Sequence, residues 1–298
     1  MARYPIYVIS KGRFDQCLTA DFLVADNVPF CLVVEPQERK QYAAKYGDDR
    51  IHVLPFSNLG QGSIPARNWV KDHATEQGYA RHWILDDNIK RVIRWYKTRR
   101  ISCESGPAFC AIEDFVDRYE NIALAGMNYA MFAYGMGKGG KGKPPFHLNN
   151  HVYSCFLIDN NIPHRWRGRY NEDTDLCLQV LANGWCTVLV NAFLIEKMQT
   201  MTMKGGNTDE LYKDDGRLKM ARSLERLWPN VVKTDRRFQR PQHVVRDRWE
   251  KFDTPLKRKA GVDLSNIKPN EYGLRPVAIK PIKSESLKQA IGVAESDK

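Results

Sequence analysis

The chain has 298 residues, enough to bury a full hydrophobic core, and its apolar and aromatic content is that of a globular protein, which excludes wholesale disorder. Its formal net charge of +11 is high for this size. That surplus either keeps the protein soluble or faces a polyanion, such as nucleic acid or acidic lipid. Seven cysteines without a CxxC pair argue against a disulfide framework and for a reducing compartment. With no signal-peptide pattern and no apolar run of membrane-spanning length, we expect a soluble, cytoplasmic protein without a membrane partner.

Short apolar runs alternate with amphipathic segments over the first part of the chain. The runs predict strands at residues 6–9, 30–34, 51–54 and 83–85, and the segments between them predict helices at 14–25, after Pro36 and at 64–76. Pro65 suits the first turn of the last of these helices. Such alternation indicates an α/β fold with a mostly parallel sheet wound through right-handed crossovers and flanked by helices.

The pattern becomes less regular after residue 87. We expect strands at 92–95, 152–158 and 186–190, and helices at 112–121 and 172–183. Residues 135–145 are rich in glycine and lysine and predict a loop without regular structure.

The last third of the chain is basic and is expected to be helical. Between Arg217 and Lys259 fourteen Lys and Arg stand against five Asp and Glu, with aromatic residues between them. We therefore divide the chain into a core at 1–208, a basic helical extension at 209–268 and an extended or loose tail at 269–298. Cations interleaved with aromatic side chains suit a nucleic acid. The candidates for this contact are Arg236, Arg237, Arg240 and Trp249, with the loop 138–143 as the next place to look.

The strongest local signal is Asp86-Asp87-Asn88, directly after the apolar run 83–85. Parallel strands place such residues at their carboxyl edge, where ligands bind in open α/β sheets. Two carboxylates and an amide are hard oxygen ligands suited to Mn²⁺ or Mg²⁺. We assign Asp87 and Asn88 to the metal, and Asp86 to the orientation of the turn or of a ribose. The alternative is an ordinary turn or helix cap, where the same residues are common.

A second acidic motif, Asn171-Glu172-Asp173, opens the predicted helix at 172–183. Negative charge is favourable in a first helical turn, so these residues could be a plain capping segment. The functional interpretation is a general base that takes the proton of an acceptor hydroxyl, with Asp173 as the base and Glu172 beside it.

Three further motifs fall at the same predicted edge: Ser10 to Arg13 after the first strand, Glu35 after the second, and Ala66-Arg67-Asn68 at the start of a helix. Each could be a surface loop taken singly, but together they suit a nucleotide diphosphate. Lys11, Arg13 and Arg67 would neutralise phosphates, and Glu35 would accept from a ribose or base. The full set assigned to the donor is Ser10, Lys11, Arg13, Glu35, Arg67, Asn68 and Asp86, with Lys204 in the later Lys204-Gly205-Gly206 turn.

These motifs resemble a glycosyltransferase of the GT-A fold over residues 4–210. Within that class the segments 7–13, 65–68, 85–88 and 171–175 are similar to the TET-associated glycosyltransferases, found largely in phages, which decorate 5-hydroxymethylcytosine in DNA. The resemblance implies a metal-dependent hexosyl- or N-acetylhexosaminyl-transferase that uses a nucleotide sugar, with UDP as the expected nucleotide and host cytoplasm as the location if the protein is viral. Asn88 departs from the family pattern because it stands at the last position of DxD.

The resembled class often has a late histidine as a further metal ligand. Residues 197–206 contain none. His147 and His151 are candidates for the acceptor side.

Two alternatives to a DNA-modifying enzyme stay open. A transferase for a polysaccharide, lipid or protein acceptor would share the sheet-edge site but would not need the basic C-terminal third. A nucleotide-binding protein without catalysis would be favoured if the acidic turn bound no metal.

Overall fold

The secondary structure comes from a computed structural model, which describes residues 2–96, 99–133, 144–198, 216–237, 240–246, 249–266 and 277–278. The strands are β1 (Ile6–Ile9), β2 (Cys31–Val34), β3 (Ile51–Val53), β4 (Arg81–Asp86), β5 (Ile89–Tyr96), β6 (Arg99–Ser102), β7 (Ile122–Tyr129), β8 (Phe146–Leu148), β9 (Cys155–Asp159), β10 (Cys186–Lys197), β11 (Val232–Arg237), β12 (Arg240–Val245) and β13 (Val277–Ala278). The α-helices are α1 (Leu18–Ala25), α2 (Arg39–Tyr46), α3 (Ile64–Glu76), α4 (Ser105–Val116), α5 (Ala130–Ala133), α6 (Glu172–Ala182) and α8 (Gly216–Leu227). Short 3₁₀ turns are η1 (Pro36–Glu38), η2 (Asp48–Arg50), η3 (Trp249–Lys251) and η4 (Leu264–Asn266).

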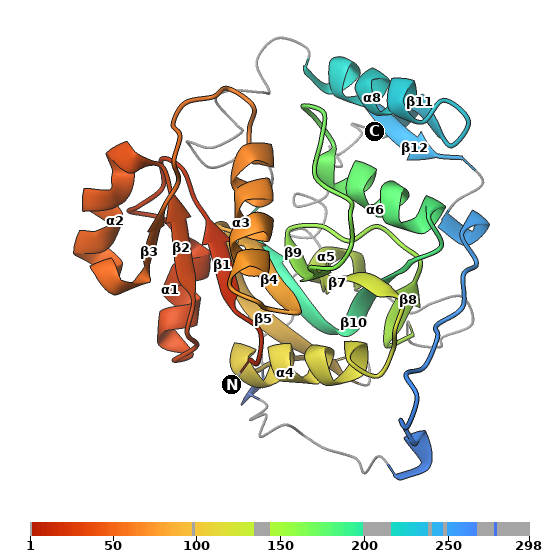
Figure 1. Ribbon diagram of the computed structural model, residues 1–298, viewed down its shortest axis with the longest axis horizontal. Helices are drawn as coiled ribbons and strands as arrows, with labels where there is room; N and C mark the ends of the chain where they lie inside the picture. Colours follow the sequence, from red (N-terminus) through yellow and green to blue (C-terminus); the bar gives the residue numbers. More distant parts are fainter. Residues whose placement is uncertain are drawn as a thin grey trace, which may run out of the picture.

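The first four strands form the parallel half of a large central sheet (Figure 1). β1 pairs in parallel with β2 and β4, and β2 pairs in parallel with β3. Strand β1 is buried on both faces, because Ile6 and Val8 pack into a core with α1, α2 and α4, whereas Tyr7 and Ile9 pack into a second core with α3 and α6. The predicted α/β class is confirmed, and so are the four predicted strands and the helix that begins at Ile64.

The second half of the sheet is mixed. β7 and β10 pair in parallel, but β9 lies antiparallel between β4 and β7, and β5 pairs antiparallel with β10 and with β6. The sheet order is β13-β6-β5-β10-β7-β9-β4-β1-β2-β3, with β8 added to β10. The prediction of parallel strands therefore holds for β3-β2-β1-β4 and for β7 with β10, and the antiparallel strand β9 connects these two parts.

Strand β7 was not predicted, although it lies near the middle of the sheet. Its sequence is rich in small residues, which have weak strand preference. Gly126 explains part of this composition, because a Cβ atom there would lie 2.1 Å from the carbonyl oxygen of Cys155 on β9. Close packing between the two backbones therefore requires glycine at this position.

The prediction that the basic extension is helical is only partly right. Helix α8 is present, but it is followed by an antiparallel hairpin of β11 and β12. Pro229 follows the helix and cannot continue it, and the β-branched residues Val231, Val232, Thr234, Val244 and Val245 favour strands. The hairpin and α8 pack on α6 through an apolar cluster that contains Leu178, Leu224 and Val232.

The loop predicted at 135–145 and the tail predicted at 269–298 fall mostly outside the described residues. Within the tail, β13 pairs antiparallel with β6. No helix in the described ranges is both long enough and apolar enough to cross a membrane.

Candidate active site

A cavity of about 420 Å³ lies where β1, β2 and β4 end, and we call it the central cavity. It meets the first turn of α6 on one side and the C-terminal ends of β7 and β10 on the other. Most of the residues predicted for the site line it: Ser10, Lys11, Arg13, Glu35, Arg67, Asp86, Asp87, Asn88, Glu172 and Asp173. The carboxyl edge of the parallel strands therefore holds the predicted constellation.

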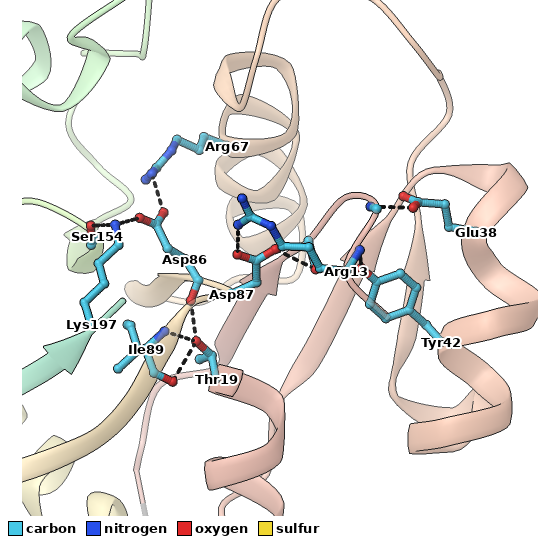
Figure 2. Close-up of polar contacts among 12 residues, drawn as sticks. Arg13, Thr19, Glu38, Tyr42, Arg67, Asp86, Asp87, Ile89, Ser154 and Lys197 are labelled. Carbon is cyan, nitrogen blue, oxygen red and sulfur yellow. Dashed lines mark hydrogen bonds and ion pairs between the residues drawn. The ribbon is translucent and has the colours of Figure 1, made fainter. Parts of the chain in front are cut away.

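Thr19 of α1 fixes the acidic turn between β4 and β5 (Figure 2). Its hydroxyl donates to the carbonyl oxygen of Asp86 at 2.6 Å and accepts from the backbone N–H of Ile89 at 3.0 Å. Its backbone N–H donates to the carbonyl oxygen of Asp87 at 3.1 Å. The directions of the Asp86 and Asp87 side chains are thus set by backbone contacts to a neighbouring helix.

Asp86 lies between two cations, the buried Arg67 and the partly buried Lys197. Arg67 Nη2 is 2.8 Å from its Oδ1, and Lys197 Nζ is 2.7 Å from its Oδ2. Burial disfavours the carboxylate, but Lys197 and Arg67 outweigh that cost and hold the pKa of Asp86 well below its usual range. Lys197 also donates to Ser154 at 2.6 Å (Figure 2). A further contact of 3.3 Å to the Tyr129 hydroxyl helps to fix its ammonium group in place.

Asp87 faces the opposite direction, toward β1. Its Oδ1 is 2.6 Å from Arg13 Nη1, and its Oδ2 accepts a hydrogen bond from Ser10 at 2.8 Å. Tyr42 supports both partners, because its hydroxyl lies 2.7 Å from the Ser10 hydroxyl and accepts from the backbone N–H of Arg13 at 3.1 Å (Figure 2). Burial raises the pKa of Asp87 in spite of Arg13.

The oxygens of this turn suit a small divalent ion. The side-chain oxygen of Asn88 is buried and has no hydrogen-bond partner, and both Asn88 and Asp87 line the central cavity. One carboxylate and one amide oxygen form the limited protein contribution that Mg²⁺ uses when phosphates and water complete its shell. No group of three or more His, Cys, Asp or Glu among the described residues could hold a metal by itself. The donor set therefore fits an ion that binds together with a phosphate ligand.

Asp173 lies in the first turn of α6, and Arg67 connects it to the acidic turn. Arg67 Nη2 is 3.6 Å from Asp173 Oδ1, which has no hydrogen-bond partner although it is buried. Burial, reinforced by Glu172 and Asp86, raises the pKa of Asp173 to about 7 against the opposing effect of Arg67. Glu172 accepts a hydrogen bond from Ser63 at 2.9 Å. Asp173 thus has the pKa expected of a general base at neutral pH.

Lys11 and Glu35 form an ion pair of 3.2 Å where β1 and β2 end. Glu35 is 7% exposed and also accepts from the backbone N–H of Asn58 at 3.1 Å and from Gln37 at 2.6 Å. Together with Ser10 and Arg13, these two residues make up what we call the β1–β2 side of the central cavity.

Two residues predicted for the donor are not placed in the cavity. Asn68 hydrogen-bonds the backbone of Trp166 in both directions, at 2.8 and 3.1 Å, so its amide holds a loop against α3. Lys204 lies outside the described residues.

Across the central cavity from the β1–β2 side lie residues that the sequence did not predict for the site. Tyr129, Phe132 and Tyr153 form an aromatic cluster, in which the rings of Tyr129 and Tyr153 are 4.2 Å apart. Ser154 has a left-handed backbone at φ 60°, an uncommon conformation for this residue type, and this places its hydroxyl against Lys197. These residues, with His151, make up the β7–β9 side of the cavity. Only His151 carried a signal in the sequence, as one of the two histidines proposed for the acceptor; His147, on β8, is not among the residues that line the cavity.

The residues predicted to contact DNA lie on the extension. Arg236 and Arg240 are exposed at the turn end of the β11–β12 hairpin, and the side chain of Arg237 lies outside the described residues. Trp249 is half-buried and stacks on His151, with ring centroids 5.8 Å apart.

An acidic turn, fixed cations and a partly buried carboxylate thus meet at one cavity, at the edge of an open α/β sheet where such folds bind nucleotides. The sequence profile of the TET-associated glycosyltransferases matches residues 4–206, and the chain belongs to this family. A solved structure assigned as a nucleotide-diphospho-sugar transferase from Desulfovibrio desulfuricans is similar over 60% of this chain and 77% of that chain, with 10% identity and a TM-score of 0.33. The comparison with curated proteins gave no match.

Proposed function

We propose that the protein transfers a sugar, a hexose or N-acetylhexosamine, from a UDP-sugar to the hydroxyl of 5-hydroxymethylcytosine in DNA. The observation that carries the proposal is Asp173, a partly buried carboxylate with a raised pKa that faces the central cavity beside Arg67 and the acidic turn. Family membership supports glycosyl transfer, and the basic extension supports a nucleic-acid acceptor.

The β1–β2 side is suited to the nucleotide diphosphate. Lys11 and Arg13 provide cations where β1 ends, and Arg67 and Lys197 provide two more across the acidic turn. Their carboxylate partners hold these cations in place before a ligand arrives, which lowers the entropic cost of binding a phosphate. Glu35 is placed to accept hydrogen bonds from the nucleoside.

The chemistry requires one proton transfer by the protein. Asp173 takes the proton of the hydroxymethyl group while that oxygen forms a bond to the anomeric carbon. The bond from this carbon to the diphosphate breaks, and the nucleoside diphosphate leaves with the electron pair. Because the diphosphate gains charge, Arg67 and Lys197 stabilise the transition state more than the ground state.

We keep Mn²⁺ or Mg²⁺ as a proposed cofactor. Asp87 and Asn88 would hold it, since Asn88 offers an unpartnered buried oxygen. When bound, the ion would stabilise charge on the diphosphate. For Asp86 we keep the other role predicted for it, the orientation of the turn or of a ribose, with its carboxylate held between Lys197 and Arg67.

The test is incubation of the purified protein with a panel of nucleotide sugars, Mn²⁺ and DNA that contains hydroxymethylcytosine, followed by mass spectrometry of the digested nucleosides. We expect one UDP-sugar to add the mass of its sugar to hydroxymethylcytosine, and unmodified DNA to remain unchanged. Consumption of the donor without a DNA product would favour a polysaccharide, lipid or protein acceptor. Binding of the nucleotide without any turnover would favour a non-catalytic protein.

A further inference from the structure

The segment 216–266 lies beyond the residues that match the family, yet it is tightly joined to the helix that carries Asp173. Trp228 donates from its indole N–H to Asp175 at 2.7 Å, and Asn171 donates to the carbonyl oxygen of Met220 at 2.7 Å. An apolar cluster between α6, α8 and the hairpin covers the same interface. The extension is therefore packed directly against the catalytic end of α6.

This packing brings a histidine of β12 into the central cavity. His243 Nε2 lies 3.4 Å from the hydroxyl of Thr174, the residue after Asp173. His151 Nε2 lies 3.2 Å from the same hydroxyl, so Thr174 connects a histidine of the core to one of the extension. Trp249 of the extension stacks on the imidazole of His151, with the two rings inclined by 15°.

His243, Thr174 and His151 form an uncharged surface beside the strongly charged acidic turn. Burial lowers the pKa of His151 to about 3 and that of His243 to about 4, so both imidazoles are neutral near pH 7. A neutral imidazole offers one donor and one acceptor, and the buried Thr174 hydroxyl orients both rings through its contacts with their Nε2 atoms. Tyr153 meets His151 edge to face at 4.9 Å, and Phe132 is 47% exposed where it lines the cavity.

We propose that the C-terminal hairpin completes the acceptor site, where His243, Thr174 and His151 hold the polar edge of a planar, uncharged heteroaromatic base next to Asp173. The inference rests on the proposed function and adds the residues that recognise its acceptor. An unstacked base needs ring faces to stack on and neutral donors and acceptors along its edge, and this wall supplies both. A phosphate would instead require cations, and those that line the cavity lie around the acidic turn and the β1–β2 side, apart from Arg169 in the loop before α6.

The experiment measures the KM for a hydroxymethylcytosine oligonucleotide and the KM for the sugar donor in the full-length protein. We expect His243→Ala to raise the acceptor KM about tenfold, the order expected for one lost hydrogen bond, with the donor KM unchanged. His243→Gln should recover most of the loss because its amide can replace the Nε2 contact. Gln242→Ala, on the same strand but away from the cavity, is the matched control and should match wild type.

Thr174→Val keeps the side-chain shape and should raise the acceptor KM alone, which preserves the test if His243→Ala fails to fold. Acceptor KM values within twofold of wild type for both His243→Ala and Thr174→Val, in a protein that glycosylates DNA, would overturn the inference and leave the proposed function standing. The inference would also be overturned if His243→Ala changed only the salt dependence of DNA binding, because the hairpin would then contact phosphates. A wild-type protein that modifies no hydroxymethylated DNA would remove the proposed function and this inference together.

Discussion

The two sides of the central cavity differ in charge: one is lined by ion pairs and the other mainly by uncharged side chains. On the β1–β2 side the cations have carboxylate partners, as in Lys11 with Glu35 and Arg13 with Asp87. The β7–β9 side is formed by aromatic rings, the Ser154 hydroxyl and a neutral histidine, and His243 of the extension continues it. Lys197, which contacts Tyr129 and Ser154 there, is paired with Asp86 of the acidic turn. The first side is built for a charged ligand, and the second suits a flat, uncharged one.

Asp173 lies where these two environments meet, and this position explains its pKa. Arg67 attracts a negative charge, but burial and the neighbouring carboxylates oppose it, so the group can hold or release a proton near neutrality. Burial and the charges of Glu172, Asp86 and Arg67 together adjust the pKa of this single carboxylate to a value suited to a base.

Removal of metal should have the largest effect on the β1–β2 side. We expect a chelator to abolish sugar transfer, and Mn²⁺ or Mg²⁺ to restore it, because Asp87 and Asn88 would hold the ion against the diphosphate. Asp87→Ala should be inactive in both conditions, whereas Asp48→Ala, an exposed acid outside the cavity, should behave as wild type. Full activity of Asp87→Ala without metal would contradict the metal assignment.

Asp173→Asn should lower kcat by about 10² to 10⁴, the usual range for loss of a general base. The variant should fold and bind both the donor and DNA, because its shape is conserved; calorimetry with UDP and a DNA-binding assay check this. If turnover stays near normal, Glu172 becomes the candidate base. Asp175 does not, because it is fully buried among Arg167, Gln179 and Trp228 and does not line the cavity.

Arg13→Met should weaken nucleotide binding by about 1.5 to 3 kcal/mol, the range of a hydrogen bond to a charged group. Lys11→Met should have a smaller effect, because Lys11 is more exposed than Arg13. Titration with UDP measures both, and Arg39→Met, at an exposed residue of α2 outside the cavity, is the control. Unchanged affinity in Lys11, Arg13 and Arg67 variants alike would mean that the nucleotide binds elsewhere.

Changes at the hairpin tip should have the smallest effect. Arg236→Ala and Arg240→Ala should each lower the slope of log affinity against log salt by about one unit per lost phosphate contact, without changing the affinity for UDP. Arg165→Ala, at an exposed ion pair with Asp72, is the control. An unchanged slope would move the DNA contact elsewhere, with residues 138–143 as the next candidates.

The two sides also differ in how far the sequence predicts them. Ser10, Glu35, Asp86 and Asp87 each follow an apolar run directly, so the rule that parallel strands end at one edge was sufficient to bring them together. The fold of residues 6–86 follows from the same alternation.

The β7–β9 side had no comparable signal. Tyr129 ends a strand of small residues that was not predicted, and Lys197 ends a twelve-residue strand of which only the first part was predicted. His243 reaches the cavity only because a hairpin, predicted as helix, packs on α6. Such contacts depend on antiparallel pairing and on packing between distant segments, which local patterns do not specify.

The most direct test of Asp173 as the base is the single-turnover rate of sugar transfer at saturating donor and DNA, measured as a function of pH. Since the base acts in its ionised form, we predict that the wild-type rate falls about tenfold per pH unit below an apparent pKa of about 7 and is level above it. Asp173→Asn should be slow at every pH and should lose this titration. An Asp173→Asn variant that kept the wild-type rate and the same pH profile would contradict the account.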